Sequence, residues 1–404
     1  MSPSAGRIGR LPIWYLLVYA LTSGFGGVYN TFLGVYLKDI GCTGAQIGQL
    51  LAATAVVALL SQPFWGLVGD RARSVNGLFR LLLSVSAVAV AVFPLSRSYA
   101  WLLGMMALFS FFSSSTYFLQ DVITLQNIER TQHKYGTIRL GATIGFAVAA
   151  TVAGAFADRG IAWLFPIAGG IYALAALASL GIPNVSGHQP KGPKMPVSVL
   201  LKNRDLVLLA VFVFFLNLGF SYFSGFFSIH YQALGADGAL IGLTWTMSTL
   251  LEIPFLIFAD RIVRRLGTKP TVLLAGVVMG ARWLLVGTVT DVHAMLAVNL
   301  LHGLTLIVVI YCMATFINRE VPMELKSTAQ GFFSLIAMGV PRIVASFLGG
   351  YANDAFGIPA VFLFFGALTL AAVLAFGAVL LWRRRVPPTA LPPEVVPIPS
   401  EWAG

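Results

Sequence analysis

Twelve apolar runs, each long enough to cross a lipid bilayer, make up most of this chain. A bilayer core about 30 Å thick needs a helix of roughly 20 apolar residues. In lipid, an unpaired backbone polar group costs several kcal/mol, so each run is expected to be helical. The runs lie at 13–37, 46–69, 77–96, 99–125, 135–157, 161–182, 204–230, 239–259, 270–289, 292–317, 325–351 and 357–382. The sequence therefore predicts an all-α membrane protein with twelve transmembrane helices.

Composition and charge agree with a membrane location. Hydrophobic residues make up 58% of the chain and charged residues 10%, with a mean hydropathy of +0.85. A soluble fold of this length would need far more surface charge. With the loops assigned alternately to the two sides, and residues near a span end counted with the adjacent loop, 21 of the 26 Lys and Arg fall on one side, three on the other and two deep within spans. This asymmetry predicts a multi-pass protein of the bacterial cytoplasmic (inner) membrane with both termini in the cytoplasm.

The net charge of +11 thus reflects topology and contacts with lipid headgroups, and no nucleic-acid partner is expected. The first apolar run is too long for a cleavable signal peptide, and a second run follows at once. Cys42 and Cys312 lie in distant parts of the chain and are not expected to pair. No spacing typical of metal ligands occurs, so neither a metal nor another cofactor is predicted.

The two halves of the chain repeat the same short signals. Glycines at 41 and 48 reappear at 235 and 242, and the pair Gly154 and Asp158 reappears as Gly350 and Asp354. Duplicated halves in so apolar a chain are typical of a transporter built from two parallel repeats, with the site between them. We therefore expect a bundle over 1–182, a cytoplasmic linker over 183–203, a second bundle over 204–385 and a disordered Pro-rich tail over 386–404. The two six-helix bundles would be related by pseudo-two-fold symmetry.

A further repeated signal closes one span in each half. It comprises Gly66, Asp70 and Arg71 in the first half and Asp260 and Arg261 in the second. These charged residues are expected to pair with neighbouring helix ends at the cytoplasmic face, where they would bias a gate rather than contact substrate.

Few ionisable residues fall inside the spans, where one charge costs about 3 kcal/mol on insertion scales. Glu252 lies near the middle of span eight, Arg282 near the middle of span nine and His302 near the middle of span ten. We expect them at one depth, facing one cavity, where their protonation would be coupled as proton-linked transport requires. The alternatives are a structural buried ion pair between Glu252 and Arg282 and a neutral core histidine at His302.

Other polar residues lie closer to the helix ends. Asp121 ends span four, Arg139 begins span five, and Arg342 lies in the outer half of span eleven. All three are candidate substrate-binding residues, although charged groups near helix ends can also extend to the membrane surface. Asn30 is a candidate cavity-lining residue.

The chain, apart from its tail, resembles the major facilitator superfamily. Within it, the segments 62–71 and 121–146 are similar to the lactose permease (oligosaccharide:proton symporter) family, and 282–283, 301–305 and 329–331 resemble the phenylpropionate-permease branch. The resemblance implies that Asp121 and Arg139 bind substrate and that Phe146 stacks on it. It also implies that Arg282 and His302 take part in proton coupling.

The sequence departs from the lactose permease pattern at several positions. Thr249 stands at the place of a sugar-binding acid, and Glu252 follows one helical turn later on the same face. Thr305 replaces the carboxylate that carries the proton in that permease, and Asn299 replaces a lysine. The proton is therefore expected on Glu252, Asp121 or His302.

The balance of positive and negative side chains expected at the site favours an anionic substrate. Arg139, Arg282 and Arg342 set against Asp121 and Glu252 leave one guanidinium without a partner, which a substrate carboxylate could supply. We predict a monomeric proton-coupled symporter of a small organic or aromatic carboxylate that works by alternating access. A sugar or nucleoside symporter and a proton-driven exporter are the alternatives. An exporter is disfavoured because no proline occurs between Arg139 and Phe165. An enzyme or scaffold is disfavoured because no catalytic constellation is present, and a channel because duplicated bundles suit alternating access.

Overall fold

The computed structural model describes residues 13–128, 135–187, 200, 203–321 and 325–385. The predicted tail over 386–404 and most of the predicted linker over 183–203 lie outside these residues. Helices account for nearly all of the described chain, and no strand occurs in it. This agrees with the prediction of an all-α membrane protein.

The first half consists of helices that follow the predicted spans closely. Their bounds are α1 (Ile13–Asp39), α2 (Gly44–Arg71), α3 (Val75–Ala91), η1 (Phe93–Leu95), α4 (Tyr99–Ser113), α5 (Thr116–Ile128), α6 (Tyr135–Ala157), η2 (Ile161–Trp163), α7 (Leu164–Ala178) and η3 (Ser179–Gly181). Predicted span four is interrupted between α4 and α5, beside the hydroxyls of Ser61 and Ser114, which lie 2.8 Å apart.

The second half follows the same order. Its bounds are α9 (Arg204–Ala233), α10 (Gly238–Leu250), α11 (Glu252–Leu266), α12 (Thr268–Thr288), α13 (Val292–Asn299), η4 (Leu300–Leu304), α14 (Leu306–Glu320), α15 (Lys326–Ser334), η6 (Leu335–Gly339), α16 (Val340–Phe356) and α17 (Ile358–Arg385). When helices separated by a short interruption are counted as one segment, eleven helical segments of the described chain are long and apolar enough to cross a membrane. The remaining predicted span, α1, is rich in Gly and Tyr and is mostly buried.

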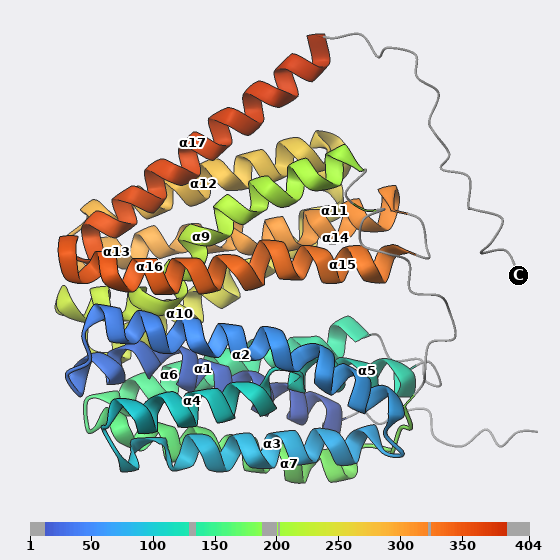
Figure 1. Ribbon diagram of the computed structural model, residues 1–404, viewed down its shortest axis with the longest axis vertical. Helices are drawn as coiled ribbons and strands as arrows, with labels where there is room; N and C mark the ends of the chain where they lie inside the picture. The colour runs from blue at the N-terminus through green and yellow to red at the C-terminus, as the bar shows by residue number, and fades with distance from the viewer. Residues whose placement is uncertain (1–12, 129–134, 188–199, 201–202, 322–324, 386–404) are drawn as a thin grey trace, which may run out of the picture.

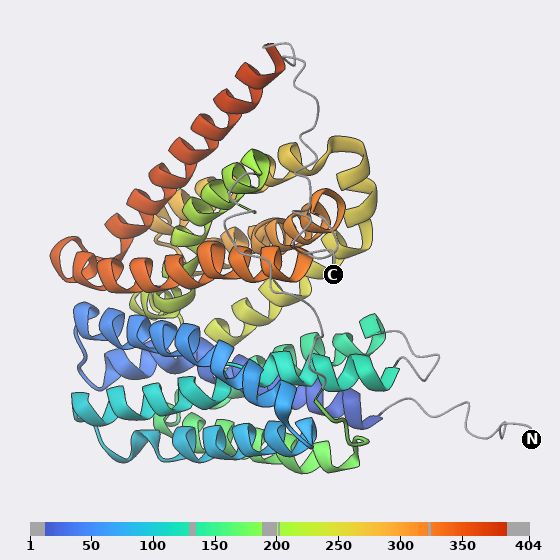
Figure 2. The same ribbon diagram turned by 45° about the vertical axis from the view of Figure 1, so that its right-hand side comes forward.

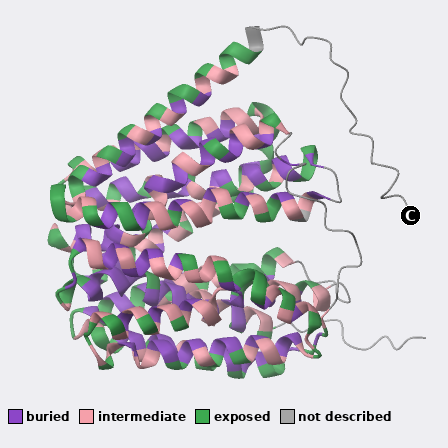
Figure 3. Ribbon diagram, viewed as in Figure 1, coloured by how far each residue is buried: buried purple, intermediate pink, exposed green. Residues whose placement is uncertain are grey.

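The two halves form separate helical bundles stacked on each other (Figures 1 and 2). In both views their ribbons approach at the left and diverge at the right. Figure 3 shows buried residues inside each half and where the halves meet, whereas the outer faces are largely exposed. Those faces carry large apolar side chains such as Leu60, Val88 and Phe364, as expected for surfaces that contact lipid.

The halves meet through two equivalent helix pairs at the end where α1 leads into α2. We call this the seal end; it includes the connections 39–44, 157–161, 233–238 and 356–358. There α2 packs on α16 and α6 packs on α10, with glycines at each crossing. A Cβ atom on Gly48 would lie 2.3 Å from the carbonyl oxygen of Ser346, and one on Gly242 would lie 2.3 Å from that of Ala150. Only glycine allows the backbones to approach this closely.

An aspartate closes each of these crossings by binding the helix N-terminus of the other half. Asp354, near the end of α16, accepts hydrogen bonds from the backbone N–H groups of Gly44 (2.7 Å) and Ala45 (2.8 Å). Asp158, just after α6, accepts one from Gly238 at 3.0 Å. A carboxylate at a helix N-terminus satisfies free N–H groups and complements the helix dipole. Every hydrogen bond that joins the two described halves lies toward the seal end.

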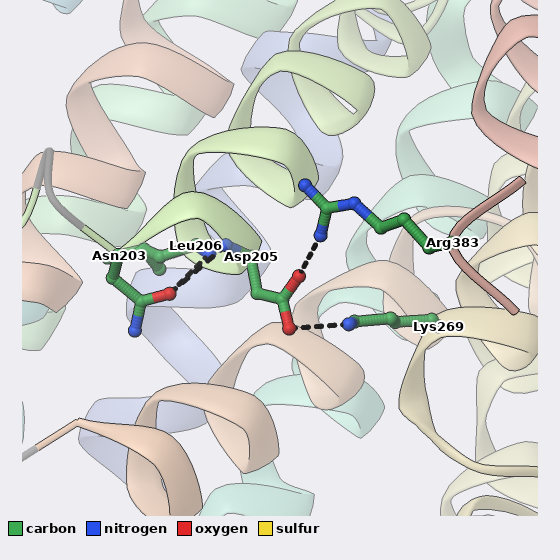
Figure 4. A network of polar contacts seen from close by, with 5 residues as sticks. All are labelled: Asn203, Asp205, Leu206, Lys269 and Arg383. Carbon is green, nitrogen blue, oxygen red and sulfur yellow. Dashed lines mark hydrogen bonds and ion pairs between the residues drawn. The ribbon is translucent and has the colours of Figure 1, made fainter. Parts of the chain in front are cut away.

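The other end of the second half is held by a polar network around Asp205 (Figure 4). Asn203 caps α9 through its side-chain oxygen, which accepts from the N–H groups of Asp205 and Leu206. The Asp205 carboxylate accepts from Lys269 of α12 at 2.6 Å and from Arg383 of α17 at 2.5 Å. This network ties three helices of one half together and does not reach the other half.

Three predicted spans of the second half are interrupted near their middle. Pro254 cannot donate a hydrogen bond to the carbonyl of Leu250, so α10 gives way to α11 at Leu251. A 3₁₀ segment, η4, separates α13 from α14, and a π-helical turn, η6, separates α15 from α16. Such interruptions are frequent at functional sites in membrane helices.

Candidate functional site

In the first half, two tyrosines bind the predicted acid, and one of them, Tyr135, also contacts the predicted arginine. Asp121 of α5 accepts hydrogen bonds on Oδ1 from the hydroxyls of Tyr19 (2.5 Å) and Tyr135 (2.8 Å). Arg139, one turn after Tyr135 on α6, donates from Nη1 to the Tyr135 hydroxyl at 3.3 Å. Asp121 and Arg139 thus belong to one cluster, but they do not form an ion pair with each other.

A second group of side chains surrounds Gly26 on α1. A Cβ atom on Gly26 would lie 3.2 Å from the side-chain nitrogen of Asn30, 3.5 Å from the hydroxyl of Tyr117 and 3.9 Å from the ring of Phe146. Asn30 is exposed and Tyr117 is 49% exposed. Phe146 lies seven residues after Arg139 on α6, so the two share a helix face. An aromatic ring, an amide and a guanidinium are thus available along this part of the first half.

Arg342 brings a second guanidinium to the contact between the halves. It lies on α16 just after the π-helical turn, and it is close enough to Tyr29 of α1 for the two groups to interact electrostatically. Arg342 is exposed and has no hydrogen bond or ion pair with another described residue. Arg139 is also exposed and contacts only a neutral hydroxyl. Two guanidinium groups, one from each half, therefore lack a carboxylate partner in the described chain.

Glu252 and His302 meet at the interruptions of the second half. His302 Nε2 lies 3.6 Å from Glu252 Oε1, and the glutamate side chain is 29% exposed while the histidine is 7% exposed. The close packing of η4 on the end of α10 makes this possible, since a Cβ atom on Gly303 would lie 2.0 Å from the Leu251 carbonyl oxygen. The pair joins one accessible carboxylate to one buried imidazole.

For Arg282, the structure differs from the expectation of a residue that faces an open cavity. Its side chain is 0% exposed. Its Nη2 donates to Asn299 Oδ1 at 2.6 Å, and its guanidinium lies 4.2 Å from the centre of the Phe223 ring. The alternative, a buried ion pair between Arg282 and Glu252, is not formed either, although Arg282 still interacts electrostatically with His302. Burial by aromatic residues from α9 explains the difference, and those residues gave no signal of this role in the sequence.

The remaining predicted residues contribute less to the cluster. Thr249 is half-buried and donates to the Trp245 carbonyl of its own helix at 3.1 Å. Thr305 likewise bonds within its own span, to the His302 carbonyl at 2.5 Å.

The repeated charged signals lie away from the seal end. Asp260 accepts from the Tyr311 hydroxyl at 2.5 Å. Asp70, Arg71 and Arg261 form no side-chain hydrogen bond or ion pair with the described residues, and nothing lies within 4 Å of a Cβ built on Gly66. Among the residues that the structure describes, the predicted pairing of this signal with a neighbouring helix is therefore present in the second half and not in the first.

Sequence reasoning missed the tyrosines. Tyr19, Tyr135 and Tyr117 supply the hydroxyls of the first half, yet they differ little from the other aromatic residues in apolar runs. The available signal was the spacing of Tyr135 one turn before Arg139. In the described residues, no group of three or more His, Cys, Asp or Glu could hold a metal ion.

Comparisons with known proteins agree with this architecture. The family model described as MFS_1 like family matches residues 8–364. The chain is 28% identical to the maltose permease of Geobacillus stearothermophilus, over 92% of this chain and 94% of that protein. It is 24% identical to a probable 3-phenylpropionic acid transporter of Escherichia coli (strain K12), over 93% and 98% of the two chains. A crystal structure of the nucleoside transporter NupG superposes with a TM-score of 0.80 at 17% identity, covering 91% and 98%.

Proposed function

We propose that this chain, which belongs to the MFS_1 like family of membrane transporters, imports a small organic carboxylate together with a proton. The observation that carries the proposal is the pair of exposed guanidinium groups. Arg139 and Arg342 come from opposite halves, and neither has a carboxylate partner among the described residues. A carboxylate on the substrate would supply the missing partner.

An unpaired charge within a membrane protein costs free energy. A guanidinium without a counter-ion is poorly tolerated there, and planar bidentate hydrogen bonding makes arginine well suited to carboxylates. A ligand whose carboxylate is bound by one of these arginines and whose body contacts the opposite half would stabilise a state in which the halves close around it. The charge of the substrate would then couple its binding to movement of the two bundles.

The neighbouring side chains favour an aromatic body on the substrate. Phe146 and Tyr117 converge on Gly26 beside the polar Asn30. Stacked or edge-on aromatic contacts stabilise such a ring in addition to the area it buries. One relative is named as a transporter of 3-phenylpropionic acid, a carboxylate with this shape.

For the proton we favour the contact between Glu252 and His302. A carboxylate and an imidazole 3.6 Å apart lie just beyond hydrogen-bond distance, so a small movement would let a proton pass between them. Arg282 would act on this pair from its buried position, through its electrostatic interaction with His302. Asp121 is the other candidate proton carrier, but it is already engaged by two hydroxyl donors.

Alternating access fits the distribution of contacts. The halves are joined at the seal end, and we propose that this end faces the outside of a bacterial cytoplasmic membrane, with both termini inside. Substrate would then reach Arg139 and Arg342 from the cytoplasmic side in this conformation. We propose that the protein acts as a monomer.

A sugar substrate is the second candidate. It is favoured by the identity to a maltose permease and by the acid, arginine and aromatic residues of the first half, which could bind hydroxyl groups. A nucleoside substrate would use the same groups, and a proton-driven exporter would use the same proton site in the opposite direction.

Uptake into proteoliposomes tests the proposal. Radiolabelled 3-phenylpropionate should accumulate when the lumen is alkaline and only equilibrate when the gradient is collapsed. Maltose serves as the matched neutral ligand. Accumulation of the carboxylate without a pH gradient would refute proton coupling, and accumulation of maltose alone would refute the substrate class.

A further inference from the structure

The Asp121 carboxylate is held by tyrosines although an arginine lies within reach. Tyr19 and Tyr135 both donate to the same oxygen, Oδ1. The Tyr135 hydroxyl also accepts a hydrogen bond from Arg139, so one oxygen atom lies between the acid and the guanidinium. The two charged side chains therefore lie on either side of the Tyr135 hydroxyl.

The two tyrosine rings are fixed in place by packing. Tyr19 is 4% exposed on α1. The rings of Tyr19 and Tyr135 meet edge to face, with centroids 6.4 Å apart and planes at 80°. Since a carboxylate with two short hydroxyl donors is well stabilised without a cation, Asp121 gains little by moving toward Arg139.

The state of Arg139 follows from this arrangement. An arginine paired with an aspartate offers a ligand a neutral pair, whereas an arginine that contacts only a hydroxyl offers a full positive charge. The neutral pair would suit the hydroxyl groups of a sugar, and the free guanidinium suits an anion.

We propose that Tyr19 and Tyr135 are specificity-determining residues that reserve Arg139 for an anionic substrate by holding Asp121 away from it. This inference rests on the proposed function, because it explains how an acid and an arginine in one cluster can select a carboxylate. The two tyrosines act through Asp121 and are positioning residues.

Loss of both hydroxyls should let Asp121 pair with Arg139. The variant Tyr19→Phe/Tyr135→Phe keeps both rings and removes only the two donors. Its apparent KM for 3-phenylpropionate should rise about two- to fivefold, the scale on which one partly exposed ion pair shifts an equilibrium. Adding Asp121→Asn should lower the KM again, because the competing charge is gone. A purely structural role would give no such rescue.

A chemical readout separates this inference from the identity of the substrate. Phenylglyoxal modifies free guanidinium groups, and peptide mass spectrometry of the purified protein reports the rate at Arg139. We expect reaction in the native protein, slower reaction in the double Phe variant and recovery when Asp121→Asn is added. Tyr15→Phe, one turn before Tyr19 on α1, is the matched control and should leave the rate unchanged.

Equal reactivity of Arg139 in the native protein and the double Phe variant would overturn the inference. The expected reactivity pattern without any binding of 3-phenylpropionate would support the tyrosine arrangement and overturn the proposed substrate. A KM that rises in the double Phe variant and rises further with Asp121→Asn would also overturn the inference, because it would make Asp121 a direct substrate ligand.

Discussion

Removal of the Asp354 carboxylate should loosen the seal end. The substitution Asp354→Ala deletes two charge-assisted hydrogen bonds, of 2.7 and 2.8 Å, to the first N–H groups of α2. A carboxylate at a partly buried helix N-terminus contributes about 1–2 kcal/mol. Here that free energy is present only while the halves are joined. Its loss should raise the ratio of open to sealed molecules roughly 5- to 30-fold.

The native thiol of Cys42 lies beside the helix N-terminus that Asp354 binds. Cys42 lies two residues before Gly44 and is 8% exposed. Burial also raises the pKa of the Cys42 thiol, which keeps the reactive thiolate scarce. Alkylation by a maleimide in detergent, followed by peptide mass spectrometry, should therefore be slow in the native protein. It should be roughly 5- to 30-fold faster in Asp354→Ala if the reaction requires opening.

Asp237→Ala is the matched control for this experiment. Asp237 caps α10 through the N–H of Leu240 at 2.7 Å, within its own half. Its loss should weaken α10 without releasing a contact between the halves, so Cys42 should react as in the native protein. Equal rates in Asp354→Ala and the native protein would refute the argument that this carboxylate holds the seal.

Three further predictions concern packing, proton coupling and stability. Gly48→Ala should also speed alkylation of Cys42, because the added methyl would lie 2.3 Å from the Ser346 carbonyl oxygen. Gly104→Ala is the control and should leave the rate unchanged, since nothing lies within 4 Å of a Cβ at that position. Glu252→Gln should abolish accumulation driven by a pH gradient but retain substrate exchange in a counterflow assay; normal accumulation would exclude Glu252 as the proton carrier. Asp205→Asn should lower Tm by only a few degrees, since exposed ion pairs contribute about 0–1 kcal/mol each, and a much larger drop would contradict this.

The helices and their duplication were predictable because apolar length and repeated glycines are local signals. Gly41 and Gly235 are paired by the repeat. Both have positive φ, and each lies two residues after the end of a helix, α1 and α9 respectively. The repeat likewise gave Asp158 and Asp354 equivalent places. It could not indicate that each binds the opposite half, because a repeat does not specify how its copies contact each other.

The chemistry of the site was less predictable. The resemblance brought Asp121 and Arg139 into one cluster, but hydroxyl groups from α1 and α6 decide that the two do not pair. The contact of Glu252 with His302 follows from their shared depth. The burial of Arg282 does not, because it depends on how Phe223 of another helix packs. Residue spacing predicts neighbours on one helix, whereas these contacts arise between helices.

The most direct test of a carboxylate site is binding of a matched ligand pair to the purified protein. 3-Phenylpropionate and its amide have the same shape and differ in the charged group. A ligand at about 100 times its Kd adds about 2.7 kcal/mol to the stability of the folded state, which a thermal-unfolding assay detects. We predict that 3-phenylpropionate raises Tm, that the amide does not, and that Arg342→Gln removes the effect. Stabilisation by the amide or by maltose, with none by 3-phenylpropionate, would contradict a site built for an anion.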